Sequence, residues 1–288
     1  MNEPGGPRAD VLLWGVIAAW TAVTLASFFA PAVLSPNHAR YVNVALMSVF
    51  TLLHGARRYG WAGIGVYFAI ACLVANGFEN LSITTGLPFG QYHHTAAMGP
   101  KLFQVPLIIG PIFAVAGYLA WVVTGILLGA VFGAPEHGLA VARCVLAAAV
   151  TTMWDLCVDA IGGTVNRDWI WAHGGAFFGV PWLNFAGWLL TMWVIFQLFA
   201  GYVTRVGQVR PVPVASPYWL QPVVFWLLIA LQFPLLALIV PEAAITDAAG
   251  ATWSMHGLFT SMAVVSVFTM GFTGLLAWVL LARARAGH

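Results

Sequence analysis

Residues 139–161 read LAVARCVLAAAVTTMWDLCVDAI, an apolar run that carries two aspartates close to its end. A helix needs about 20 apolar residues to cross a bilayer, and this run supplies that length. A carboxylate at the centre of such a helix costs about 2.5 to 3.5 kcal/mol, so it usually faces a cavity and has a function. The run therefore predicts a membrane helix and makes Asp155 and Asp159 candidates for chemistry.

The whole chain has the composition of an integral membrane protein. Of its 288 residues, 61% are hydrophobic and only 7% are charged, whereas a soluble surface is usually roughly 25–35% charged. The eleven basic residues are scattered and the net charge is +2, which argues against a nucleic-acid partner. The three cysteines lie in apolar runs without the spacing of a metal site. We expect one all-α membrane domain over residues 1–288, with no metal ion.

Eight apolar runs predict a polytopic bundle of eight transmembrane helices. The second run is short, so seven helices is the alternative. The first run is too long for the core of a signal peptide and should remain as a helix. The predicted helices span residues 11–34, 41–56, 61–81, 104–132, 139–161, 181–203, 219–240 and 253–282.

Basic residues orient this bundle. With the N-terminus inside, the cytoplasmic segments carry more arginine than the opposite segments, as the positive-inside rule requires. We therefore expect a protein of the cytoplasmic membrane with both termini in the cytoplasm. The cytoplasmic set is Arg8, Arg57, Arg58, Arg205, Arg210, Arg283 and Arg285, and the opposite set is Arg40, Lys101 and Arg167.

This topology gathers the polar residues near one side of the membrane. The two longest polar connections, 82–103 and 162–180, both fall on the non-cytoplasmic side. Glu79 ends the third predicted helix, Asp155 and Asp159 lie in the last turns of the fifth, and Asn184 opens the sixth. These residues can share one pocket.

The two aspartates are four residues apart, which places both carboxyl groups on one face of a helix about one turn apart. Two like charges repel in a medium of low dielectric constant, so the pair either shares a proton or binds a cation. The alternative is that Asp155 and Asp159 both lie at the water interface and solvate a helix end.

Two neighbouring stretches add further polar candidates. Asn80 and Glu79 belong to a polar stripe on the third helix, which for the asparagine favours contacts between helices. The connection TTGLPFGQYHH at 84–94 predicts a tight turn that holds Tyr92, His93 and His94 against the bundle. Adjacent histidines rarely point at one ion, so a proton relay to Glu79 is favoured over a metal site.

The segment 166–188 alternates aromatic and polar residues. Tryptophan and tyrosine are expected at bilayer interfaces, and that role accounts for much of the aromatic content. It accounts less well for His173 and Asn184, because neither residue is needed to anchor a helix at the headgroups.

Several short motifs in order resemble the carotenoid biosynthesis family of membrane hydratases, which includes the bacterial CruF-type carotenoid hydratases and is related to the archaeal bisanhydrobacterioruberin hydratases. The chain departs from the family pattern at Ala160, where a proline is expected, and at His93-His94, which replace a more aromatic pair. The residues that carry the resemblance are Glu79, Thr85-Gly-Leu-Pro-Phe-Gly-Gln-Tyr92, Gly99-Pro100, Val105-Pro106, Asp155-Leu-Cys-Val-Asp159, Trp169-Ile-Trp171 and Gly179-Val-Pro-Trp-Leu-Asn-Phe-Ala-Gly-Trp188.

The resemblance implies addition of water to the terminal double bond of an acyclic carotenoid end group, as in lycopene, γ-carotene or a C50 precursor, to give a tertiary alcohol. This reaction needs a strong acid, stabilisation of a tertiary cation and one placed water, and no cofactor. One of Asp155 and Asp159 would be the acid, and Glu79 the base that orients the water. Aromatic ring faces would stabilise the cation. The candidates for binding substrate or water are Asn80, Tyr92, His93, His94, Trp154, Trp169, Trp171, His173 and Asn184.

The expected partners are a carotenoid within the bilayer, membrane lipids and other enzymes of the carotenoid pathway. Two other classes of function remain open. An Asp-x-x-x-Asp on a membrane helix also suits a magnesium-dependent prenyltransferase, although the chain lacks a second acidic cluster for the metal–diphosphate. Intramembrane carboxylates also suit a transporter, and a carotenoid-binding protein without catalysis is a further alternative.

Overall fold

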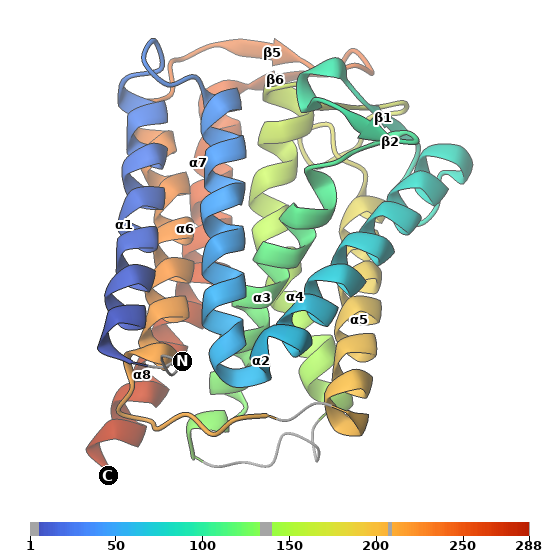
Figure 1. Cartoon of the computed structure of the whole chain (residues 1–288). Helices are drawn as coiled ribbons and strands as arrows, with labels where there is room; N and C mark the ends of the chain where they lie inside the picture. The colour runs from blue at the N-terminus through green and yellow to red at the C-terminus, as the bar shows by residue number, and fades with distance from the viewer. Residues whose placement is uncertain (1–5, 133–139, 207–208, 288) are drawn as a thin grey trace.

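The computed structural model describes residues 6–132, 140–206 and 209–287, and Figure 1 shows a bundle of long helices with short strands across one end. The helices are α1 (Pro7–Phe29), α2 (Pro36–Thr85), α3 (Ile109–Leu127), α4 (Ala140–Asp159), α5 (Trp182–Arg205), α6 (Leu220–Ile239), α7 (Met255–Ser266) and α8 (Phe272–Ala286). The strands are β1 (Tyr92–His94), β2 (Lys101–Leu102), β3 (Val105–Pro106), β4 (Trp169–Trp171), β5 (Ala244–Thr246) and β6 (Thr252–Ser254).

Seven helical segments of the described residues are long and apolar enough to cross a membrane. One of them, α2, has 50 residues and bends at Gly60, where the backbone has φ 68° and ψ 169°. The two arms of α2 run in opposite senses along the bundle (Figure 1), so they form two of eight passes. They correspond to the predicted helices 41–56 and 61–81. The prediction of an all-α polytopic bundle is therefore confirmed.

Proline and glycine set helix ends that differ from the prediction. The first helix ends at Phe29, not at residue 34, because Pro31 disfavours a helical conformation at the residue before it. The third predicted helix runs past residue 81 to Thr85, where Gly86 closes it with φ 81°. Glu79 therefore lies inside α2 rather than at its end. The predicted start of the fifth helix at residue 139 lies outside the described residues.

The most central helix is α3, because 89% of its apolar 18-residue stretch is buried. It packs against both α2 and α4, and α4 also packs against α5. Large apolar side chains remain exposed on the outer helices, for example Leu73, Leu238 and Phe268. Such exposure would be unfavourable in water, and it suits helices whose outer faces contact lipid.

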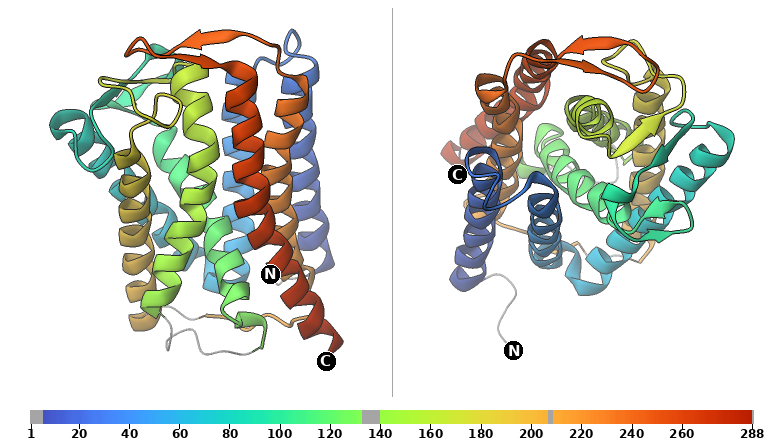
Figure 2. Two further views of the ribbon diagram at one scale, coloured as in Figure 1. Left: turned by 180° about the vertical axis from the view of Figure 1, so that it is seen from behind. Right: turned by 90° about the horizontal axis from the view of Figure 1, so that it is seen from above.

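The two ends of the bundle differ. Both termini and the bend of α2 lie at one end, and the strands lie at the other (Figure 1). Seen from above, β4 and β5–β6 lie across this second end (Figure 2). Strand β1 pairs with β4 in antiparallel register, with Tyr92 opposite Trp171 and His94 opposite Trp169. This two-stranded pairing is called the β1–β4 ribbon below, and it joins the connection after α2 to the connection after α4.

Candidate active site

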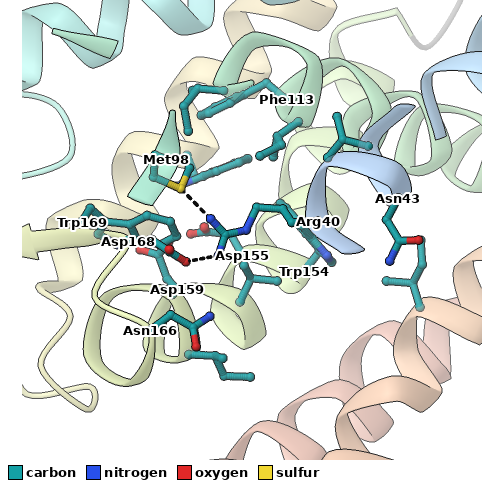
Figure 3. Close-up of a pocket in the computed structure, with 18 of the residues that line it drawn as sticks. Arg40, Asn43, Met98, Phe113, Trp154, Asp155, Asp159, Asn166, Asp168 and Trp169 are labelled. Atoms are coloured by element: carbon teal, nitrogen blue, oxygen red, sulfur yellow. Dashed lines mark hydrogen bonds and ion pairs between the residues drawn. The ribbon is translucent and has the colours of Figure 1, made fainter. Parts of the chain in front are cut away.

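A cavity of about 270 Å³ lies at the strand end of the bundle. Its wall includes side chains from α1 to α6 and from both strands of the β1–β4 ribbon. Figure 3 shows polar side chains on one side of this cavity, among them Arg40, Asp155, Asp159 and Asp168. Apolar and aromatic side chains line much of the rest. The cavity therefore combines acidic groups with an apolar compartment.

Three carboxyl groups are buried in the polar part of this wall. Asp155 is 1% exposed, Asp159 4% and Glu79 5%. The two aspartates are one turn apart near the C-terminal end of α4. The amide of Asn184, in the first turn of α5, donates a hydrogen bond to Asp155 Oδ2 at 3.0 Å. This bond fixes one carboxyl of the pair.

Two of the other carboxyl oxygens of the pair lack a donor among the described residues. Within the described residues, neither Asp155 Oδ1 nor Asp159 Oδ2 has a hydrogen-bond partner, although both are buried. An unpartnered buried polar atom is costly. A proton on one carboxyl group, or a bound water molecule, would satisfy these atoms.

Glu79 is held by the β1–β4 ribbon. Its Oε2 accepts a hydrogen bond from the hydroxyl of Tyr92 and a second from His94 Nε2 at 3.1 Å. Burial raises the pKa of Tyr92 well above 10, and the negative charges of Glu79 and Asp159 raise it further. Tyr92 therefore keeps its proton and acts as a donor to Glu79.

The alternation of side chains along a strand decides which ribbon residues reach the cavity. Residues two apart point to the same face, and directly paired residues share a face. Tyr92 and His94 are therefore on one face with Trp171 and Trp169, and all four line the cavity. His93 is on the opposite face and is exposed.

An ion pair compensates the fourth acidic residue of the wall. Arg40 Nη2 lies 2.5 Å from Asp168 Oδ2, and Arg40 Nη1 contacts Met98 Sδ at 2.8 Å (Figure 3). With Arg40 engaged in this way, His94 is the other basic residue among the described lining residues. Burying three unpaired negative charges would cost several kcal/mol for each ion. The arrangement therefore favours one proton shared by the Asp155–Asp159 pair, next to the hydrogen-bonded Glu79.

Aromatic rings form the apolar part of the cavity next to the carboxyl groups. Trp188 stacks on Phe113 with ring centroids 3.8 Å apart, and Trp154 meets Trp188 edge to face at 5.8 Å. Trp171 packs on Tyr92 at 4.7 Å. The faces of such rings attract a cation by roughly 0.5 to 2 kcal/mol each. The cavity can therefore stabilise positive charge that develops near the acids.

The structure brings together most of the residues singled out from the sequence. The cavity wall includes Glu79, Tyr92, His94, Trp154, Asp155, Asp159, Trp169, Trp171 and Asn184. Three predicted residues lie outside it. His93 faces away for the reason given above, and His173 is exposed on the connection after β4. Asn80 bonds Asn76 and accepts from the backbone N–H of Gln104 at 3.1 Å, so it braces two segments.

Sequence reasoning missed Arg40 and Asp168 as residues of the site. Asp168 directly precedes Trp169-Ile-Trp171, so its place beside two aromatic candidates was a usable signal. Arg40 carries no local signal, because its partner lies 128 residues further along the chain.

The described residues contain no group of three His, Cys, Asp or Glu side chains arranged to hold a metal ion. The expectation that no metal ion or organic cofactor takes part stays a prediction. The chemistry open to the residues present is proton transfer by carboxyl groups, next to rings that stabilise a cation.

Comparison with known proteins identifies a family that matches most of the chain. Residues 39–251 match the model of a family described as "Carotenoid biosynthesis protein". The bisanhydrobacterioruberin hydratase of Haloarcula japonica is 29% identical over 147 residues, which are 51% of this chain and 48% of the relative. The matched region thus spans about half the length of that curated relative. No solved structure matches the chain.

Proposed function

Because the chain belongs to the carotenoid biosynthesis protein family, we propose that it is a carotenoid hydratase of the cytoplasmic membrane. It adds water across the terminal double bond of an acyclic carotenoid end group and forms a tertiary alcohol. The single observation that carries this proposal is the set of three buried carboxyl groups, Glu79, Asp155 and Asp159, in an aromatic cavity within a membrane bundle. The name of the partial relative, a hydratase, supports it.

The first step is protonation of carbon. One of Asp155 and Asp159 gives its proton to the less substituted carbon of the terminal double bond, and the electron pair of that bond forms the new C–H bond. The other end of the former double bond becomes a tertiary cation. A carboxyl group can be this acid because its neighbour in the pair competes for the same proton. The aromatic rings around the cavity stabilise the cation.

The second step is capture of the cation by water. The oxygen of one water forms the C–O bond while a proton passes from that water to a carboxylate. Glu79 serves as this base, since Tyr92 and His94 hold its Oε2 in a fixed position. Return of the proton to the aspartate pair restores the starting state, so the net change is the addition of one water. Neither step requires a cofactor.

The size of the cavity fits recognition of one end of a long substrate. Sites for complete drug-sized ligands usually occupy roughly 300 to 1,000 Å³, and this cavity is about 270 Å³. We therefore place the end group of the carotenoid in the cavity and the remainder of the chain in the lipid. Lycopene, γ-carotene and C50 precursors share this kind of end.

The test is expression of the protein in bacteria that accumulate lycopene, γ-carotene or a C50 precursor, grown with and without oxygen-18 water. We expect a pigment heavier by one water whose added oxygen comes from the solvent, as measured by mass spectrometry. Unchanged pigments in all three hosts, with the protein present in the membrane, would contradict hydration. That result would favour a carotenoid-binding or transport role.

A further inference from the structure

Two tryptophan N–H groups in the cavity wall have no use in the mechanism above. Trp169 Nε1 and Trp171 Nε1 are both buried, and neither has a hydrogen-bond partner among the described residues. A buried N–H usually finds a partner, since leaving it unpaired costs the free energy of its lost hydration. One bound acceptor would satisfy both donors.

The two donors converge on one point of the chain. A Cβ atom added at Gly163 would lie 2.9 Å from Trp169 Nε1 and 3.1 Å from Trp171 Nε1. Gly163 belongs to the π-helical turn Ala160–Val165 that continues α4 beyond Asp159. Turns of this type interrupt α-helices frequently at functional sites. A side chain at position 163 would contact both N–H groups, and glycine avoids that contact.

Unpartnered acceptors lie in the same wall. Asp155 Oδ1 and Asp159 Oδ2 have no donor among the described residues, and Asp159 precedes Gly163 by about one turn. Trp171 packs on Tyr92, and both residues line the same cavity as Asp155 and Asp159. Two free donors and two free acceptors match one water molecule, which accepts two hydrogen bonds and donates two.

We propose that the indole N–H groups of Trp169 and Trp171 hold the oxygen of the water that attacks the carotenoid cation. This inference rests on the proposed hydratase function and deepens it. The two tryptophans orient the water by their N–H edges, a role distinct from stabilisation of the cation by a ring face. The hydrogens of the water then point to carboxylates, which take the proton when the C–O bond forms.

This role has a chemical signature. Once the acid has protonated the double bond, the cation has two fates. It gains the placed water, or it loses a proton from a neighbouring carbon and becomes an alkene again. In deuterium oxide the second fate leaves deuterium in the recovered carotenoid. Loss of the placed water should therefore lower hydration while exchange of hydrogen for deuterium continues.

The experiment compares Trp169→Phe and Trp171→Phe with the unchanged protein in membranes supplied with lycopene in deuterium oxide. Phenylalanine keeps an aromatic face and removes the N–H donor. We expect each variant to hydrate roughly five- to tenfold more slowly, as for the loss of one hydrogen bond, with a higher ratio of deuterium exchange to hydration. Trp226→Phe is the matched control, because Trp226 Nε1 donates to Met270 O at 3.1 Å outside the cavity.

A further variant tests the same water site by obstructing it instead of removing a donor. Gly163→Ala places a methyl group against both indole nitrogens and should raise the ratio of exchange to hydration without removing either donor. A parallel fall of exchange and hydration in both Phe variants would assign the tryptophans to the acid step or to structure and would overturn the inference. Unchanged rates would overturn it too.

Failure of the underlying function gives a different result. If the unchanged protein neither hydrates lycopene, γ-carotene and a C50 precursor nor exchanges their hydrogens, the hydratase proposal fails and the water site fails with it. If the unchanged protein hydrates and the tryptophan variants match it, the water site alone fails.

Discussion

At the scale of single residues, the site depends on how few positive charges face its carboxyl groups. Arg40 forms an ion pair with Asp168. Among the described lining residues, this leaves His94 as the basic side chain that faces the other three acidic residues, Glu79, Asp155 and Asp159. A proton shared by the aspartate pair lowers the cost of burying these groups. The same proton is the one that the proposed hydration adds to carbon in its first step, so the electrostatics of burial and the proposed chemistry favour the same state.

Substitution of either aspartate tests this reasoning. We expect Asp155→Asn and Asp159→Asn each to lower the rate of hydration at least 100-fold, because a general acid contributes about 10²- to 10⁴-fold. Product formation from labelled water, normalised to the amount of protein in the membrane, measures the effect. Glu242→Gln serves as control, since its carboxylate is exposed on the connection after α6. Full activity in both single aspartate variants would refute the role of the pair.

Tyr92 provides a prediction on pH. Its pKa in the folded protein is raised, chiefly by burial, whereas an unfolded tyrosine has a pKa of about 10. Above pH 10 the unfolded chain releases this proton and the folded protein retains it, so the free energy of unfolding falls as pH rises towards the folded value. Tyr92→Phe removes this contribution. Between about pH 8 and pH 10.5, the unfolding temperature in detergent should fall less in the variant than in the unchanged protein. An equal fall would contradict the assignment.

At the scale of elements, the β1–β4 ribbon is fastened to the bundle by Arg40 of α2 and Asp168 next to β4. Asp168 also donates its backbone N–H to Gly162 O and accepts from Thr95 N, both at 2.9 Å. These contacts hold the ribbon over the cavity. The ion pair therefore contributes to the shape of the site although neither residue is placed in a proton-transfer step.

A double-mutant cycle tests this attachment. Arg40→Met and Asp168→Asn should each destabilise the protein by up to about 3 kcal/mol, because breaking a buried pair leaves one charge without its partner. The double variant should lose less than the sum of the two single variants. Unfolding by denaturant in detergent micelles measures the free energy of unfolding of the unchanged protein and of the three variants. Strict additivity would mean that the two side chains do not interact in the folded protein.

The elements also show what sequence reasoning can reach. Long apolar runs predicted every membrane pass, because length and hydropathy alone set that requirement. Pro31 and Gly86 then moved two helix ends by a few residues. The ribbon was not predicted, since the register that pairs Tyr92 with Trp171 joins two distant segments. Without this register, the sequence does not distinguish His93 from His94 as a site residue. The ion pair of Arg40 with Asp168 could not be predicted either, because the two residues are 128 positions apart.

At the scale of the whole molecule, an even number of passes puts both termini on one side and the site near the other (Figure 1). We expect a cysteine at Ala251, exposed next to β6, to react in intact cells with a maleimide that cannot cross the membrane. A cysteine at Ala286, exposed at the end of α8, should react only after the membrane is made permeable. Both variants keep the three native cysteines, so labelling of the unchanged protein measures the background reaction of those cysteines. The reverse labelling pattern would show that the two termini lie outside the cytoplasm.

The position of the cavity towards one end of the bundle has a consequence for substrates with two identical ends. In the proposed hydratase, one end group would enter the site while the other would lie in the lipid towards the opposite leaflet, out of reach of the acids. A symmetrical carotenoid must leave, turn end for end and bind again before its second hydration. The enzyme should therefore be distributive, so that the singly hydrated carotenoid accumulates ahead of the doubly hydrated one in a time course. Appearance of both products together from the first time points would show that the substrate turns without leaving.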